Sequence, residues 1–142
     1  MKIKIINKSG YPNPAYETPL SSGCDLRAVL SQPITLQPLD RVTVMTGIHI
    51  ALPEGYEAQV RPRSGLTRKN GIVAAFGTVD CDYRGEIGVT LMNLSHDDFT
   101  VRPGERIAQL VIVPFEQAEW EDCNELDSTE RGTKGFGSSG MK

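Results

Sequence analysis

The segment from Gly77 to Glu86 gathers side chains that could activate a water molecule. It reads Gly-Thr-Val-Asp-Cys-Asp-Tyr-Arg-Gly-Glu and holds three carboxylates, a tyrosine and an arginine. Asp80 follows two residues that favour strands, so we expect it at a strand end. There its direction is fixed, as general-base catalysis requires. A charged hairpin turn without a chemical role is the alternative that this stretch alone leaves open.

A second segment, from Arg61 to Leu66, could bind an anion. It places two arginines and a serine hydroxyl at the expected start of a short helix. The free N–H groups and the dipole at a helix start attract anions, and the planar guanidinium of Arg63 suits phosphate. An exposed basic turn in which Ser64 caps the helix would account for the same residues.

Two further polar side chains, Asp25 and Gln109, could have either a structural or a ligand-binding role. Asp25 follows a flexible glycine in Ser22-Gly-Cys-Asp-Leu26, and an aspartate at a turn is usually structural. Gln109 interrupts the apolar run from Ile107 to Val113, where a buried amide must find partners or cost stability. From the residues alone we favour a satisfied core glutamine over a ligand donor.

Several other chemistries find no support in the sequence. The two histidines, His49 and His96, lie in separate regions, and no zinc spacing, phosphate-binding G-x-x-x-x-G-K-[ST] or G-x-S-x-G motif occurs. What is left is a set of Arg, Asp, Ser, Gln and glycine-rich backbone. That set suits a phosphate ligand with a divalent ion held mainly by phosphate oxygens.

Alternating apolar residues predict a chain of many short strands. The pattern from Arg41 to Leu52 predicts one half-buried strand, and Ile107–Val113 is apolar on both faces. The one helix signal spans Ser64–Asn70, with Gly71 closing it. Shorter strands are predicted around Ile3–Ile5, Tyr56–Val60, Ile87–Leu91 and Phe99–Val101. Frequent turns between short strands favour an all-β sandwich, jelly roll or barrel.

The C-terminal segment differs from the rest of the chain. From Asp127 to Lys142 the large apolar side chains are Phe136 and Met141, and the remainder is Ser, Thr, Gly and charge. Such a segment cannot bury enough surface to hold itself in place. We therefore predict a β core domain over residues 1–126 and a flexible, Gly/Ser-rich lid over residues 127–142. A frayed terminus is the alternative.

Composition limits the number of domains, the classes of partner and the location of the protein. The 142 residues make about one domain, and 15 basic against 18 acidic residues leave a formal charge of −3, which argues against a nucleic-acid partner bound by bulk charge. No apolar run is long enough to span a membrane, and lysines interrupt the N-terminal segment, so we expect no membrane partner and no secretory signal. Three widely spaced cysteines favour free thiols and a cytoplasmic location.

Taken together and in order, five stretches resemble the motifs of the trimeric dUTP diphosphatase (dUTPase) family. The similarity runs from about residue 2 to residue 140. The motifs are Ser22-Gly-Cys-Asp-Leu-Arg-Ala28, Pro62-Arg-Ser-Gly-Leu66, Gly77-Thr-Val-Asp-Cys-Asp-Tyr-Arg-Gly-Glu86, Gly104-Glu-Arg-Ile-Ala-Gln-Leu110 and Arg131-Gly-Thr-Lys-Gly-Phe-Gly-Ser-Ser-Gly140.

The resemblance implies a fold, an assembly and a reaction. It implies an all-β, jelly-roll-like fold with a short helix near residues 64–70 and a flexible C-terminal arm. It implies a homotrimer with active sites between subunits. The implied reaction is Mg²⁺-dependent hydrolysis of dUTP to dUMP and diphosphate, by attack of water on the α-phosphate. That reaction supplies dUMP for dTMP synthesis and keeps uracil out of DNA.

The resemblance also implies roles for individual residues. Asp80 would orient and deprotonate the water, Tyr83 would pack on the deoxyribose, and Asp25 would order the water shell of the metal, with no direct protein ligand. Arg131 would act as an arginine finger and Phe136 would stack on uracil. The implied catalytic residues are Asp80, Arg131, Gln109 and Ser64. The implied substrate-binding residues are Arg63, Ser64, Gly65, Gly77, Thr78, Val79, Asp80, Tyr83, Gly88, Gln109, Arg131, Phe136, Gly137 and Ser138.

The chain departs from the family pattern in the hairpin before Asp80. Where the short family version has Gly-Ala-Gly, whose main-chain groups read uracil, this chain has Ala75-Phe-Gly77. Alanine allows fewer backbone angles than glycine, and Phe76 is bulky. In the arm, Lys134 replaces a usual glycine. The change at Ala75 and Phe76 motivates an altered base preference as one competing hypothesis. A non-catalytic nucleotide-binding trimer is the other; loss of Asp80 or Arg131 would favour it, and both are present.

Overall fold

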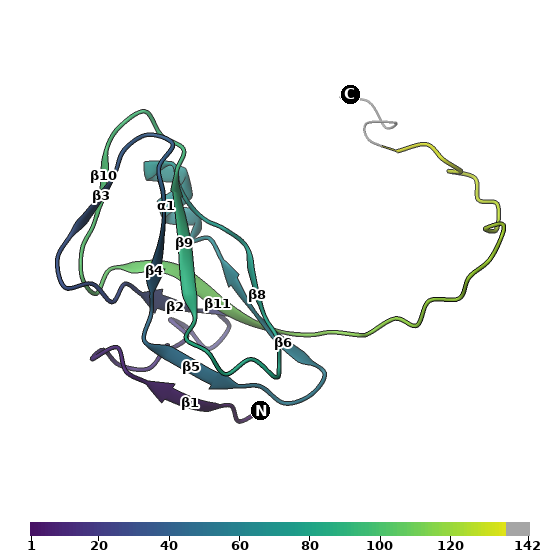
Figure 1. The fold of residues 1–142 in the computed structure, drawn as a ribbon, viewed down its shortest axis with the longest axis horizontal. Coiled ribbons are helices and arrows are strands. Elements are labelled where there is room, and N and C mark those ends of the chain that lie inside the picture. The colour runs from purple at the N-terminus through teal and green to yellow at the C-terminus, as the bar shows by residue number, and fades with distance from the viewer. Residues whose placement is uncertain (136–142) are drawn as a thin grey trace.

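The computed structural model describes residues 1–135 and is built almost entirely from strands (Figure 1). One short helix interrupts them. In chain order the elements are β1 (Lys4–Asn7), β2 (Gly23–Arg27), β3 (Ile34–Leu36), β4 (Arg41–Met45), β5 (Ile48–Ala51), β6 (Tyr56–Arg61), α1 (Ser64–Asn70), β7 (Ile72–Ala74), β8 (Gly77–Val79), β9 (Gly88–Asn93), β10 (Phe99–Val101) and β11 (Arg106–Pro114).

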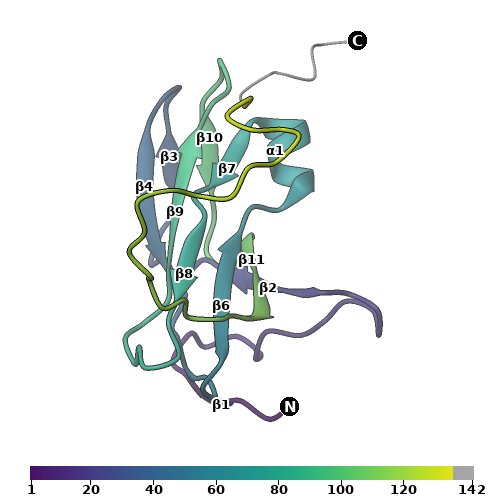
Figure 2. The same ribbon diagram turned by 90° about the vertical axis from the view of Figure 1, so that its right-hand side faces the viewer.

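The strands pair into antiparallel sheets that enclose one core. A four-stranded sheet has the order β2-β11-β6-β8, a three-stranded sheet has the order β4-β9-β7, and β1 with β5 and β10 with β3 make two smaller pairs. The buried apolar cluster draws Leu26 and Leu110 from the first sheet and Val89 and Leu91 from the second. The core therefore lies between the two larger sheets, and the jelly-roll-like β fold is confirmed (Figure 2).

The region predicted as one strand over residues 41–52 is two strands. The predicted apolar face is correct, since Val44, Ile48 and Ile50 are buried. At Gly47, however, φ is 68°, and this left-handed conformation ends β4 and lets the chain leave for a different partner. β4 pairs with β9, whereas β5 pairs with β1. Alternation cannot show such a break, because the period is the same on both sides of the glycine.

The first strand starts one residue later than predicted and does not enter the core. It spans Lys4–Asn7 and pairs with β5 alone among the described strands. Ile5 keeps 36% of its surface exposed and Ile6 keeps 60%. Ile3 packs against the core from outside the strand.

The helix occupies the predicted residues, but its start is not capped as expected. Gly71 adopts φ 67° and its N–H bonds to the carbonyl oxygens of Leu66 and Thr67, which closes the helix. The N-cap position belongs to Arg63, and no side chain bonds to the free amides there, so the cap role expected for Ser64 is wrong. The Ser64 side chain is therefore exposed with no structural task at the helix start.

The chain leaves the body after β11. The amide of Phe115 donates to the carbonyl oxygen of Gly55 at 3.0 Å, and from Glu116 to residue 135 every residue is exposed and outside any strand or helix (Figure 1). The predicted domain boundary at residue 126 stays a prediction. Phe136, Gly137 and Ser138 lie outside the described residues. Within residues 1–135 no helix is long and apolar enough to cross a membrane.

Asn93 at the end of β9 is the polar group that the fold most needs. Its side chain is fully buried. Its amide nitrogen donates to the carbonyl oxygens of Leu36 at 2.9 Å and Asp97 at 2.8 Å, and its oxygen accepts the Ser95 amide at 3.0 Å and the Ser95 hydroxyl at 2.7 Å. Asn93 thus ties the β3 strand and the turn after β9 to the core.

We expect Asn93→Ala to lower the free energy of unfolding by about 2–3 kcal/mol, because it leaves buried backbone groups without partners. Urea unfolding followed by circular dichroism measures the change. Asn70→Ala, at the exposed end of α1, is the matched control and should cost well under 1 kcal/mol. Equal losses in the two variants would show that the Asn93 bonds contribute nothing specific.

Candidate active site

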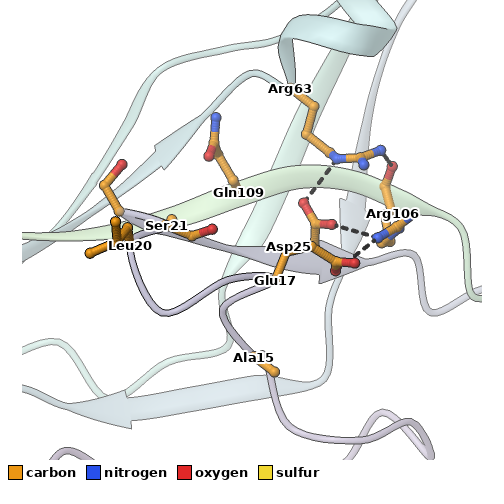
Figure 3. Close-up of a pocket in the computed structure, with 10 residues that line it drawn as sticks. Ala15, Glu17, Leu20, Ser21, Asp25, Arg63, Arg106 and Gln109 are labelled. Carbon is orange, nitrogen blue, oxygen red and sulfur yellow. Dashed lines mark hydrogen bonds and ion pairs between the residues drawn. The ribbon is translucent and has the colours of Figure 1, made fainter.

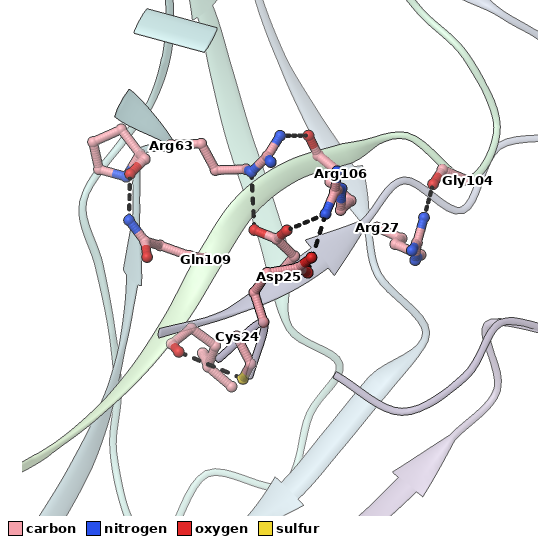
Figure 4. Close-up of polar contacts among 10 residues, drawn as sticks. Cys24, Asp25, Arg27, Arg63, Gly104, Arg106 and Gln109 are labelled. Carbon is pink, nitrogen blue, oxygen red and sulfur yellow. Dashed lines mark hydrogen bonds and ion pairs between the residues drawn. The ribbon is translucent and has the colours of Figure 1, made fainter. Parts of the chain in front are cut away.

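A half-buried carboxylate on β2 holds two arginines (Figure 4). Asp25 Oδ1 lies 2.9 Å from Arg63 Nε, and Asp25 Oδ2 lies 3.2 Å from Arg106 Nη1. Arg63 Nη1 also donates to the carbonyl oxygen of Arg106 at 3.0 Å. These contacts join the start of α1, the start of β11 and the middle of β2. Asp25 therefore fixes the direction of both guanidinium groups.

Gln109 stands beside this group because a glycine makes room for it. The ladder places Gln109 opposite Asp25, and its Nε2 donates to the carbonyl oxygen of Pro62 at 3.0 Å. A Cβ on Gly23 would collide with Gln109 Oε1, so glycine at this position lets the Gln109 side chain take this orientation. The side chain is half-buried and faces a cavity, so the core interpretation favoured from the sequence is wrong.

These groups line a cavity of about 450 Å³ at the open edge of the four-stranded sheet (Figure 3). Its charged members are two arginines and two carboxylates, the second carboxylate being Glu17, 3.6 Å from Arg106. The walls also carry hydroxyls and the Gln109 amide. The lining residues are Ala15, Glu17, Leu20, Ser21, Ser22, Gly23, Asp25, Arg63, Arg106 and Gln109. We call this cavity the phosphate pocket.

Asp80 and Tyr83 belong to a tight turn after β8. Asp80 directly follows the last residue of that strand, as predicted, and its carbonyl oxygen accepts the amide of Tyr83 at 3.1 Å. The Tyr83 hydroxyl donates to the carbonyl oxygen of Glu86 at 3.1 Å. A Cβ on Gly85 would lie 2.1 Å from that hydroxyl, so the ring position requires this glycine. Hydrogen bonds between residues of the turn therefore fix its backbone.

This turn forms one wall of a second cavity, of about 200 Å³, which we call the nucleoside pocket. The turn is also tied to the core sheet, because Glu86 Oε1 accepts the amide of Gly47 at 2.7 Å. Asp80 is exposed, and Tyr83 keeps 47% of its surface exposed. The lining residues are Val60, Gly77, Thr78, Val79, Asp80, Tyr83, Glu86, Ile87 and Gly88.

Two glycines of the predicted site, Gly65 at the start of α1 and Gly77 in the nucleoside pocket, are not explained by folding. A Cβ on Gly65 would meet nothing within 4 Å, and neither Gly65 nor Gly77 has a positive φ. At Gly77 a Cβ would make only ordinary contact, 3.5 Å from Val60. A glycine inside a helix costs about 1 kcal/mol relative to alanine. The packing of this chain therefore does not require glycine at either position.

The single chain does not bring the predicted site residues together. Asp25, Arg63 and Gln109 meet at one pocket, whereas Gly77, Thr78, Val79, Asp80, Tyr83 and Gly88 meet at another, and the two pockets share no lining residue. Arg131 lies on the arm, where its Nε donates to the carbonyl oxygen of Lys134 at 3.0 Å. Asp25 is engaged by arginines, so the metal-ordering role implied by the resemblance stays a prediction.

Sequence reasoning missed Arg106 and Glu86 as site residues. Both stand inside quoted motifs, but neither was given a role. Spacing on β11 gave no signal for Arg106, because residues three apart on a regular strand face opposite sides. A bulge between Arg106 and Ala108 sets Arg106 opposite Arg27 and so on the same face as Asp25. The contacts of Glu86 could not be foreseen, because they cross to Gly47, 39 residues away.

The cysteines lie outside this chemistry. All three are free, and the Cys24 Sγ lies 3.6 Å from the carbonyl oxygen of Leu110. Burial raises the pKa of the Cys24 thiol, which keeps it protonated and unreactive at neutral pH. Within residues 1–135 no three His, Cys, Asp or Glu side chains gather as a metal site.

The fold is a small all-β body that carries one pocket with paired arginines and a second pocket beside a locked acidic turn. A family model described as dUTPase matches residues 10–140. This chain belongs to the dUTPase family. It is 50% identical over 142 residues to the deoxyuridine 5'-triphosphate nucleotidohydrolase of Finegoldia magna, covering 99% of each chain. The corresponding protein of Fusobacterium nucleatum is 51% identical, with 99% of this chain and 97% of that protein covered.

A solved structure agrees. The dUTPase of Staphylococcus bacteriophage 80alpha, solved with dUPNHPP, superposes with a TM-score of 0.89 at 27% identity, covering 98% of both chains. The similarity therefore extends through the whole β body and into the arm, rather than being confined to the motifs.

The contact between Gly23 and Gln109 predicts a specific defect. We expect Gly23→Ala to push Gln109 out of the phosphate pocket and lower kcat/KM for dUTP about 10- to 100-fold, the scale of one lost hydrogen bond to a charged group. The fold should persist, because the displaced atom ends a flexible side chain. Steady-state kinetics measures the loss. The double variant Gly23→Ala/Gln109→Ala should be no worse than Gln109→Ala alone. Additive losses would contradict the coupling.

Proposed function

We propose that this dUTP diphosphatase hydrolyses dUTP to dUMP and diphosphate at sites that join the nucleoside pocket of one chain to the phosphate pocket of another. The observation that carries the proposal is the fixed position of Asp80. It stands at a strand end, its turn is locked by Tyr83 and Glu86, and it opens onto a pocket of nucleoside size.

In the nucleoside pocket, Asp80 is the general base. Its carboxylate holds a water molecule by accepting its hydrogen bond and takes a proton as the water oxygen attacks the α-phosphorus. Tyr83 packs on the deoxyribose and leaves no room for a 2′-hydroxyl. The backbone of Gly77, Thr78 and Val79, together with Gly88, forms the rest of the wall against the nucleoside. The locked turn supplies the positioning that this chemistry requires.

In the phosphate pocket, the donors are Arg63, Gln109 and the start of α1. Ser64 and Gly65 are free of any capping or packing task, which leaves their hydroxyl and amide for phosphate oxygens. Asp25 orients Arg63 and Arg106, whose guanidinium groups then face the anionic ligand. Donors fixed before the reaction stabilise charge that develops on the phosphoryl oxygens.

The residues present fit a Mg²⁺ ion carried by the triphosphate. Asp25 is already paired with two guanidiniums, which disfavours direct coordination and suits hydrogen bonds to metal-bound water. Bound to phosphate oxygens, the ion would neutralise charge and orient the leaving diphosphate. The protein side chains then supply the outer contacts of its water shell.

We further propose a homotrimer, with each active site shared between subunits. The two pockets of one chain are separate, and the arm departs from the body (Figure 1). A neighbouring arm would bring Arg131 to the phosphates as an arginine finger, and Phe136, with Gly137 and Ser138, to the base. The product dUMP would feed dTMP synthesis, and removal of dUTP would keep uracil out of DNA. The free cysteines favour a cytoplasmic location.

Asp80→Asn should lower kcat for diphosphate release from dUTP about 10²- to 10⁴-fold while dUTP still binds, because the amide cannot take the proton. Release is measured with Mg²⁺ beside dCTP and UTP controls, and binding by calorimetry. Asp82→Asn, on the same exposed turn, is the matched control and should stay near the wild-type rate. Normal turnover by Asp80→Asn would end its assignment as the base.

Shared sites predict recovery of activity on mixing two inactive chains. We co-express Asp80→Asn and Gln109→Ala subunits, each of which spoils a different pocket. Random assembly leaves about a quarter of the sites with both pockets intact, so activity should rise to about a quarter of the wild-type value, above either parent. If each chain built its own site, the mixture would stay as inactive as the parents. Light scattering on the wild-type protein measures the oligomeric state.

A further inference from the structure

An arginine at the end of β6 lies over an exposed aromatic ring. The Cζ atom of Arg61, the last residue of β6, lies 5.9 Å from the centroid of the Phe76 ring. Phe76 keeps 62% of its surface exposed, so it does not serve the core. The ladder pairs Val60 with Gly77, and one further step sets Arg61 opposite Phe76. This is the geometry of a cation–π contact across two strands.

The guanidinium is aimed at the ring by its neighbours on the same strand. Arg61 Nε donates to Gln59 Oε1 at 2.8 Å, and Arg61 Nη2 donates to the same oxygen. The amide nitrogen of Gln59 in turn donates to Glu57 Oε1. Residues two apart on a strand share one face. Arg61 is therefore held by a run of side chains along β6 and is not a freely moving surface arginine.

Each member of the pair is a neighbour of one pocket-lining residue on the four-stranded sheet. Arg61 is opposite Gln109 in the ladder with β11, and Gln109 lines the phosphate pocket. Phe76 immediately precedes Gly77, which lines the nucleoside pocket. Directly opposed residues of an antiparallel pair project to the same face. Phe76 is therefore joined to Arg61 by its side chain and to the nucleoside pocket by the backbone of Gly77.

The link from β7 to β8 depends on this contact. It consists of Ala75 and Phe76 alone. The Ala75 amide is bonded to the carbonyl oxygen of Thr90 at 2.7 Å, which holds one side. Neither residue has a positive φ, so alanine in place of glycine brings no left-handed strain. On the other side, the contact that holds the link is the ring of Phe76 under Arg61.

We propose that Arg61 and Phe76 form a positioning element that fixes the base-reading backbone at Phe76–Gly77 and thereby sets base selectivity. The inference rests on the proposed function of the nucleoside pocket. With a rigid link, main-chain donors and acceptors meet uracil at set positions, and a base with the reversed pattern of donor and acceptor is rejected. With a loose link, the same groups adapt to both bases.

The test compares Phe76→Leu, Phe76→Tyr and Arg61→Gln for diphosphate release from dUTP and dCTP. Leucine keeps apolar bulk without a ring, and tyrosine keeps the ring. An exposed cation–π contact supports a change of about 2- to 5-fold. We therefore expect Phe76→Leu and Arg61→Gln to raise KM for dUTP by that factor, with kcat within about twofold, and to lower the dUTP/dCTP preference equally. Phe76→Tyr should resemble the wild type.

Two controls separate the outcomes. Arg68→Gln removes the same charge from the exposed end of α1 and should change neither KM nor selectivity. The double variant Arg61→Gln/Phe76→Leu should be no worse than either single variant, because both remove one contact. Unchanged selectivity in Phe76→Leu, or a tyrosine variant as impaired as the leucine variant, would overturn the inference alone. A wild-type protein that releases no diphosphate from dUTP would overturn the proposed function as well.

Discussion

The pairing of Asp25 with two arginines is the interaction on which the phosphate pocket depends. A half-buried carboxylate is costly unless it is paired, and two guanidiniums at 2.9 and 3.2 Å meet that requirement. The pairing also serves the arginines, because without it two like charges would stand side by side at the edge of the sheet. Since Arg63 begins α1 and Arg106 begins β11, one carboxylate on β2 fixes three elements at once.

Glycines in and beside the two pockets either make room for a neighbouring side chain or leave the backbone exposed. Gly23 is small so that Gln109 can lie over it, and Gly85 is small so that the Tyr83 hydroxyl can reach a carbonyl oxygen. No contact within the chain requires glycine at Gly65 or Gly77. The first two glycines make a site rigid and the last two leave it open. A rigid frame around open backbone is what a catalyst working by position and electrostatics requires.

Much of the fold could be predicted from the sequence because the apolar period is local. The helix at Ser64–Asn70 and the alternation along β9 needed no tertiary information. The break at Gly47 could not be predicted, since glycine in a strand is compatible with either conformation. The exposure of Ile5 and Ile6 could not be predicted either, because the sequence does not show whether another element covers an apolar side chain. The motif residues were found by family resemblance, but their division between two pockets depends on strand order.

Charge explains why neither pocket is sufficient alone. The phosphate pocket holds Arg63 and Arg106 against Asp25 and Glu17, so its formal charge is zero. The nucleoside pocket adds Asp80 and Glu86 with no cation. A triphosphate brings several negative charges to these walls, so the positive charge must come from elsewhere. Under the proposed mechanism it comes from Mg²⁺ and Arg131. The four carboxylates and two arginines of the two pockets sum to a formal charge of −2, so the cations of the complex must offset the pocket walls as well as the triphosphate.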